Sequence, residues 1–237
     1  MENLKNIDKI PVKYQKKITQ YLKELLHIHQ EDIISIYTYQ SLKLNICVVF
    51  KNLDFSVLKK SLQLVNKGIR DKINAPLFLT REHIQTSSDT FPIEFLEMKE
   101  DHTLLYGEDV LANLEIEPSH IRFICEQQLK GKLIRIRQAY LEIGLRKKGM
   151  ELLVKESFES LFPIFRGLLR LKNLTPAIDR HECIKQLSES FEINSDLFLS
   201  LLDDTKNDEK IAGESIEDFL KKYILEIEKL SMVADRL

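Results

Sequence analysis

The sequence contains few of the residues that interrupt or cross-link a chain. Seven glycines, six prolines and three cysteines occur among 237 residues. So little glycine and proline argues against long loops and against a β-sandwich, because both need many turn residues. The cysteines are odd in number and show neither CxxC nor Cys/His ligand spacing, which argues against a disulfide framework and a structural zinc site. We expect them to be small buried apolar residues.

Charge of one sign and long hydrophobic runs are also lacking. The 35 basic and 37 acidic residues nearly cancel, so net charge does not indicate nucleic acid or an anionic membrane as a partner. No stretch approaches the ~20 apolar residues that span a bilayer, and the amino terminus lacks the apolar segment of a signal peptide. We therefore expect a cytoplasmic protein with no membrane partner, in which any phosphate binding is local.

Apolar residues make up 43% of the chain, and in the first part they follow both helical and strand periodicity. Helical spacing predicts a first helix from about residue 8 to 30 and a second from about 55 to 72. The runs rich in β-forming residues predict four strands, at 33–39, 44–50, 76–80 and 91–98. Asp54 precedes the second helix and is expected to be its N-cap.

After Leu105 the strand pattern ends and amphipathic helices follow one another. They are predicted at 119–145, 149–171, 176–191, 195–204 and 215–237, with Ser119 as the N-cap of the first. A helical bundle gives every apolar stripe a partner. The fold class is therefore α+β, with a small mixed sheet and flanking helices in residues 1–106 and an all-α bundle in residues 107–237.

This order of elements resembles the nucleotidyltransferase superfamily, which includes DNA polymerase beta and the kanamycin nucleotidyltransferases. The sequence is similar to a bacterial group of proteins with a nucleotidyltransferase-like domain and a helical tail. The residues that carry the resemblance are Ile34 to Ser41 (ISIYTYQS), 91–100 with 105–109, 131–140, 219–230 and 233–237.

The resemblance implies an active-site pattern from which this chain departs. Active members place Gly-Ser after the first strand, where backbone approaches the triphosphate, and Asp-x-Asp on the second strand, where both carboxylates hold paired divalent metals. Here Gln40 and Ser41 stand at the first position, and Asn45 and Cys47 stand at the second. A neutral amide and a soft thiol are poor ligands for magnesium, so we expect a degenerate site.

The third carboxylate of the family would lie on a later strand, where Glu94 and Glu97 fall, Glu94 being the better match. One carboxylate alone does not hold Mg²⁺ well, so no metal site and no cofactor are expected. If the protein were an active enzyme, Mg²⁺ would be its cofactor, with Ser41, Glu94 and Glu97 as the catalytic set. Glu108 and Asp109 follow the turn glycine Gly107 and could line the cleft of this site.

Nucleotide binding without catalysis would use Gln40 and Ser41 with a basic run in the bundle. Lys132 and Arg135 are three residues apart on one helix face and could clamp phosphates. A solvated helix face explains the same run and is the commoner outcome.

Three functional hypotheses follow. The favoured one is a catalytically inactive binding or regulatory module whose partner is a nucleotide, another protein or a second copy of the chain. The alternatives are a metal-dependent nucleotidyltransferase with atypical ligands and an antitoxin-like or scaffold component. The last helix favours homo-oligomers if its apolar stripe exceeds what one bundle buries; the stripe comprises Phe219, Tyr223, Ile227, Leu230 and Val233.

Overall fold

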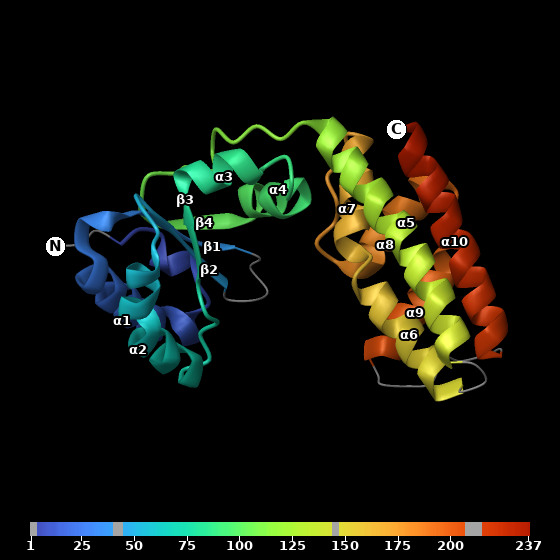
Figure 1. Ribbon diagram of the computed structural model, residues 1–237, viewed down its shortest axis with the longest axis horizontal. Helices are drawn as coiled ribbons and strands as arrows, with labels where there is room; N and C mark the ends of the chain where they lie inside the picture. Colours follow the sequence, from blue (N-terminus) through green and yellow to red (C-terminus); the bar gives the residue numbers. More distant parts are fainter. Residues whose placement is uncertain (1–3, 40–44, 144–146, 207–214) are drawn as a thin grey trace. The chain divides into compact units, whose positions relative to one another are not determined.

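The chain forms two compact units, Met1–Ile116 and Glu117–Leu237. The computed structural model describes residues 4–39, 45–143, 147–206 and 215–237. The first unit combines a four-stranded sheet with helices, and the second contains helices in its described residues (Figure 1). The predicted α+β class is confirmed.

The sheet of the first unit is mixed, with the strand order β3-β2-β1-β4. β1 runs antiparallel to both β2 and β4, and β3 runs parallel to β2. β3 and β4 are thus the edge strands. The strands are β1 (Ile33–Tyr39), β2 (Asn45–Phe50), β3 (Leu77–Thr80) and β4 (His102–Gly107).

The helices of the first unit cover both faces of the sheet. They are α1 (Val12–His29), α2 (Phe55–Arg70), α3 (Arg81–Ser87) and α4 (Pro92–Glu100), with short 3-10 turns at Ile7–Lys9 and Gln30–Asp32. α1 and α2 pack on one face through a core that includes Leu22 and Leu64, together with Ile36 and Val48 of the strands. α3 and α4 pack on the other face.

The predicted strand at 91–98 is wrong, because this segment is helix α4. Pro92 stands at the first turn of the helix, where its fixed φ suits helical geometry and its missing N–H costs nothing. Ile93, Phe95 and Met98 then bury the inner side of the helix. The fourth strand is β4, which follows directly.

Residues 107–116 pack with the first unit. Leu111 is fully buried and Leu114 is 7% exposed, in the same cluster as Phe95 and Met98 of α4. The predicted boundary after residue 106 therefore lies ten residues before the one that the packing defines.

The second unit comprises α5 (Pro118–Ile143), α6 (Lys147–Glu159), α7 (Phe162–Leu171), α8 (Arg180–Phe191), α9 (Ser195–Lys206) and α10 (Ile216–Arg236). The single helix predicted at 149–171 is two helices, α6 and α7. Pro163 explains the break, because proline is tolerated in the first turn of a helix but clashes within one. α5 begins at Pro118, so Ser119 lies inside the helix instead of capping it.

An aromatic cluster occupies the core of this unit. Phe198 stacks on Phe158 at a centroid distance of 6.1 Å and meets Phe165 and Tyr223 edge to face. Within the apolar stripe of α10, four of the five residues are at most 3% exposed, and Val233 is half-buried. The bundle itself covers this stripe, so the stripe offers no argument for a homo-oligomer. No helix within the described residues has the length and apolar character needed to cross a membrane.

Candidate functional site

The candidate site lies on the sheet face beneath α3 and α4, where the resemblance places metal ligands. Asn45 of β2 pairs with Tyr39 of β1, and Tyr39 pairs on its other side with His102 of β4. Two residues further along β2, Cys47 pairs with Tyr37. Because side chains alternate along a strand, Asn45 and Cys47 share one face.

Cys47 is sealed into apolar core. Its side chain is 0% exposed and clusters with Val49, Leu79 and Phe95. Burial raises the pKa of the Cys47 thiol to about 12, so the group is neutral at physiological pH. The residue that the resemblance aligns with the second carboxylate therefore carries no charge and is not exposed to solvent.

Asn45 is half-buried at the start of β2. Its side-chain oxygen accepts a hydrogen bond of 2.9 Å from the amide of Asn74, which precedes the edge strand β3. The residue that the resemblance aligns with the first carboxylate thus offers an uncharged oxygen that already accepts a hydrogen bond.

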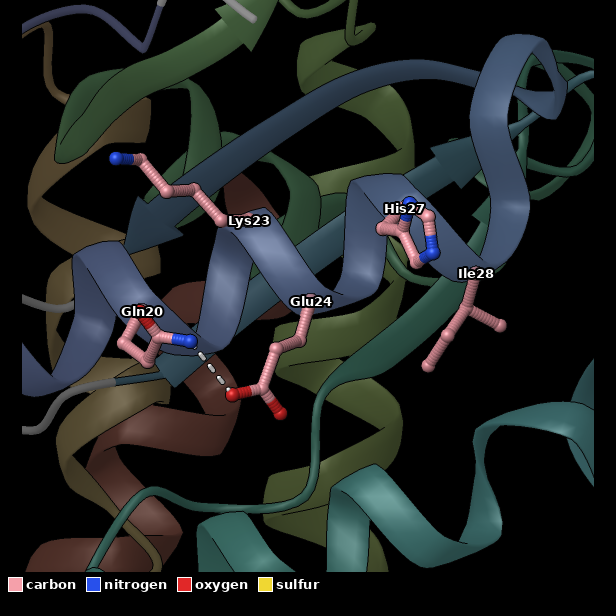
Figure 2. Close-up of a pocket in the computed structure, with 5 residues that line it drawn as sticks. All are labelled: Gln20, Lys23, Glu24, His27 and Ile28. Atoms are coloured by element: carbon pink, nitrogen blue, oxygen red, sulfur yellow. Dashed lines mark hydrogen bonds between the residues drawn. The ribbon is translucent and has the colours of Figure 1, made fainter.

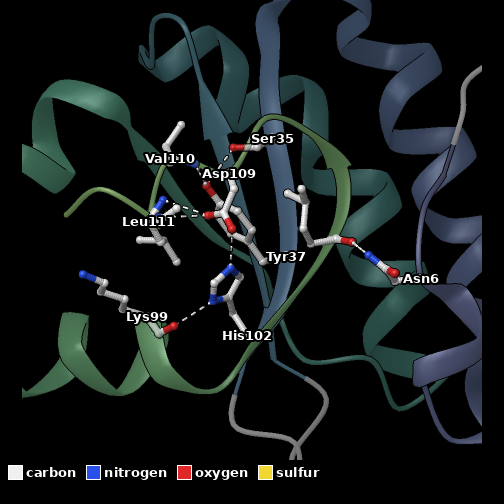
Figure 3. A network of polar contacts seen from close by, with 10 residues as sticks. Asn6, Ser35, Tyr37, Lys99, His102, Asp109, Val110 and Leu111 are labelled. Carbon is white, nitrogen blue, oxygen red and sulfur yellow. Dashed lines mark hydrogen bonds and ion pairs between the residues drawn. The ribbon is translucent and has the colours of Figure 1, made fainter.

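A polar network joins β4 to the segment that leaves it (Figure 3). The Nδ1 atom of His102 lies 3.0 Å from the carbonyl oxygen of Lys99, and its Nε2 atom lies 3.1 Å from Asp109 Oδ2. The other oxygen of Asp109 accepts hydrogen bonds of 3.1 Å from the backbone N–H groups of Leu111 and Ala112. Asp109 therefore shapes the turn into residues 110–116 and also contacts the imidazole.

Tyr37 ties the same turn to the middle of the sheet. Its hydroxyl lies 2.9 Å from Ser35 Oγ and accepts a hydrogen bond of 3.3 Å from the backbone N–H of Val110. Burial raises the pKa of Tyr37 to about 12, and its ring meets His102 edge to face at 5.4 Å. These contacts hold residues 109–112 over the candidate site.

Sequence reasoning did not foresee this network. Glu108 and Asp109, after the turn glycine Gly107, were predicted to line the cleft, and the structure places Asp109 against His102. The partnership of Tyr37 with Val110 joins residues 73 positions apart and has no local pattern.

The catalytic residues of the enzyme alternative do not lie as expected. Glu94 and Glu97 are on helix α4 and not on a strand; Glu94 is exposed in the first turn, and Glu97 is half-buried. The strand on which the third carboxylate was sought is thus the wrong element. Gln40 and Ser41 lie outside the described residues. Among the residues that are described, no three His, Cys, Asp or Glu side chains gather as metal ligands.

Lys132 and Arg135 lie on α5, in the second unit. The Lys132 amino group donates to Ser160 Oγ, and burial, followed by the charge of Arg135, lowers its pKa. Arg135 is exposed. Lys130 in the same run pairs with Glu126 one turn earlier, as in a solvated helix face.

Asp54 is the N-cap of α2, as predicted. Its Oδ1 atom accepts hydrogen bonds from Ser56 Oγ at 2.6 Å and the Val57 backbone N–H at 3.0 Å. These two bonds lower the pKa of Asp54. This carboxylate oxygen therefore serves the helix end.

A surface hollow of about 410 Å³ lies along α1 and is lined by Gln20, Lys23, Glu24, His27 and Ile28. All five residues come from one helix, and Gln20 donates to Glu24 at 2.8 Å (Figure 2). A hollow formed by one helix has no opposing wall to enclose a ligand. We interpret it as a solvated helix face.

The mixed sheet flanked by helices and followed by a helical unit defines a nucleotidyltransferase-like fold. The spectinomycin adenyltransferase AAD(9) from Enterococcus faecialis, in a crystal structure with ATP and spectinomycin, is similar with a TM-score of 0.54. Sequence identity is 13%, and the match covers 91% of this chain and 98% of the other. At this identity the likeness establishes the fold alone. No protein-family model and no curated protein matches the sequence.

Proposed function

We propose that this chain is a nucleotidyltransferase-like binding or regulatory module without transferase activity. The observation that carries the proposal is Cys47, a neutral thiol buried in the core at the position that the resemblance aligns with a catalytic carboxylate. Asn45, the other member of the pair, supplies an uncharged oxygen. Paired Mg²⁺ ions need several negative ligands at once to stabilise the transferred phosphoryl group.

A nucleotide is the ligand proposed for the first unit. The support is the fold, since the similar adenyltransferase was determined with ATP. Gln40 and Ser41 follow β1 in the sequence, where the family binds triphosphate, and are the proposed contacts. Lys132 and Arg135 are the proposed phosphate clamp of the second unit. Mg²⁺ is not required for binding of this kind, and the proposed compartment is the cytoplasm.

The test is incubation of the full chain with each labelled nucleoside triphosphate and Mg²⁺ or Mn²⁺, together with calorimetry of ATP binding with and without metal. We expect no transfer of label and binding heat that does not depend on the metal. Saturable, metal-dependent heat accompanied by transfer would contradict the proposal.

A matched pair of variants distinguishes the active-enzyme alternative from the proposed inactive module. Glu94→Ala removes an exposed carboxylate of its proposed catalytic set, and Glu100→Ala removes an exposed carboxylate at the end of the same helix. Transfer that is lost in the first variant and retained in the second would establish an enzyme with atypical ligands.

A protein partner is the second candidate, in which the chain acts as an antitoxin-like or scaffold component. An exposed apolar surface on α2 favours it. Pull-down of one specific partner would support this role, and a monodisperse monomer without a partner would count against it.

A further inference from the structure

Helix α2 carries two apolar faces, and the first unit covers one of them. The covered face comprises Val57, Ser61, Leu64 and Gly68 and lies against α1. The uncovered face, called here the α2 seam, comprises Phe55, Leu58, Leu62, Val65 and Ile69. Four of these five are exposed, at 78% for Phe55, 43% for Leu58, 56% for Leu62 and 52% for Ile69.

The spacing within the α2 seam is 3-4-3-4, the heptad pattern by which one helix packs along another. Single exposed apolar residues are common on proteins and need no explanation. A continuous stripe over four turns is different, because contiguous apolar patches mark sites where another chain docks. The pattern thus specifies a helix as the complementary shape.

The seam borders a hollow that can receive such a helix. A cavity of about 480 Å³ lies beside the seam. Its lining includes residues of the seam, residues of the edge strand β3 and the two residues before this strand. Both Leu77 and Phe78 of β3 line the cavity, Leu77 being 40% exposed and Phe78 half-buried. The hollow therefore has two apolar walls from two different elements.

The charge around the seam indicates the kind of partner. Over Phe55–Arg70 the helix carries Lys59, Lys60, Lys67 and Arg70 and no acidic residue. Lys67 pairs with Glu24, whereas Lys59 and Arg70 form no ion pair with any part of the chain that the structure describes. Lys59 itself lines the hollow. A second copy seated on the same face would bring like charges together, which is unfavourable.

We propose that the α2 seam binds an amphipathic helix of a partner protein, with apolar residues at heptad spacing and acidic residues on its flanks. The proposal concerns a surface distinct from the candidate nucleotide site and does not depend on whether transferase activity is present. It assigns the protein-partner role to a defined face.

The probe is a synthetic helix of about three heptads with leucine at the core positions and glutamate at the flanking positions. The control peptide has lysine in place of glutamate. Fluorescence anisotropy with the full chain, at concentrations where the free peptides are monomeric, should show saturable binding of the acidic helix. We expect the basic helix to bind about tenfold more weakly or worse, and the difference to shrink at high salt.

Substitutions at two exposed residues test whether the α2 seam is the binding surface. Leu62→Glu should abolish binding of the acidic helix, and Lys59→Glu should reduce it while improving binding of the basic one. Ile178→Glu is the matched control, because Ile178 is an apolar residue of the other unit that is 69% exposed. It receives the same charge, and peptide binding should not change. Circular dichroism of each variant checks that the fold is retained.

Several results would overturn the proposal. The first is that neither peptide binds, and the second is that both peptides bind equally well. The third is that Leu62→Glu binds the acidic helix as well as the unchanged protein does. Sedimentation showing a dimer that Leu62→Glu dissociates would assign the seam to a second copy of the chain instead.

Discussion

Cys47 is the residue on which the proposal of an inactive site depends, because the resemblance expects a charged and accessible carboxylate at its position. It lies with its neighbours Val49, Leu79 and Phe95 in one apolar cluster, and its side chain is not exposed to solvent. The same neighbours make the position sensitive to charge.

Cys47→Asp should destabilise the protein by about 3 kcal/mol or more, since the introduced carboxylate would be buried without a partner. Cys47→Ala, the control, should cost about 1 kcal/mol, through lost packing alone. Urea unfolding measures both. The penalty of Cys47→Asp should decrease as pH falls, because burial raises the pKa of the introduced carboxyl and protonation then stabilises the folded state. Equal costs for both variants would show that the site tolerates charge.

Gly107 and Gly131 should respond to alanine in opposite directions. Gly107 has φ of +78° at the end of β4, and a Cβ there would overlap the carbonyl oxygen of Ile34, so Gly107→Ala should cost about 2 kcal/mol or more. Gly131 lies within α5 with nothing within 4 Å of an added Cβ. Gly131→Ala should therefore stabilise the protein by about 1 kcal/mol through helix propensity. Thermal unfolding of the two variants checks both signs.

At the scale of elements, α2 is the helix whose two faces have different roles. Its inner face is held against α1 by apolar packing and by one polar contact, in which His29 Nε2 lies 2.8 Å from Ser61 Oγ. Ser61 donates its own proton to the carbonyl oxygen of Val57 at 2.9 Å, so the imidazole must be the donor to Ser61. This inner contact leaves the outer seam of α2 free for the proposed helix.

Burial lowers the pKa of His29, and the charge of Lys60 adds to the effect. His29 therefore binds its proton at a lower pH in the folded chain than in the unfolded chain, where the ordinary histidine pKa of about 6.5 applies. We expect the free energy of unfolding to fall as pH drops from 7 towards 5. His29→Gln, which can still donate to Ser61 but does not titrate, should show a smaller slope in urea unfolding over this range. Identical slopes would assign the effect to other histidines.

At the scale of the whole molecule, the boundary between the units can be tested by truncation. A fragment of residues 1–116 should unfold cooperatively, whereas residues 1–106 should not, because that fragment loses Leu111 and Leu114 from its core. Each buried leucine contributes about 1.5–3 kcal/mol, and a domain has only about 5–15 kcal/mol in total. Residues 117–237 should fold alone. Circular dichroism with urea gives the comparison, and a stable 1–106 fragment would support the earlier boundary.

The parts of the fold that could be predicted from the sequence are those that short-range patterns encode. α1, α2, β1 and β2 lie close to their predicted ranges, because the periodicity of apolar residues is a local property. The prediction for segment 91–98 was wrong because its apolar residues fit the periodicity of a strand and that of a helix alike. Pro92, at the first helical turn, was the available signal.

The features of the candidate site also fall into those that local sequence indicates and those that need the tertiary structure. The assignment of Asn45 and Cys47 to the family's carboxylate positions comes from the sequence and stays a prediction, since it requires only alignment along one strand. The sequence could not show that Cys47 is sealed, that Glu94 faces solvent from a helix, or that Tyr37 and His102 reach the turn at Asp109.

The sequence by itself determined the α+β class, the order of most elements and the neutral character of the strand pair, because each depends on residues a few positions apart. Only the tertiary structure decided that the α10 stripe is covered within its bundle while the α2 seam is uncovered in its unit. Both helices are amphipathic in the sequence, and whether an apolar face is exposed depends on neighbours that are distant along the chain.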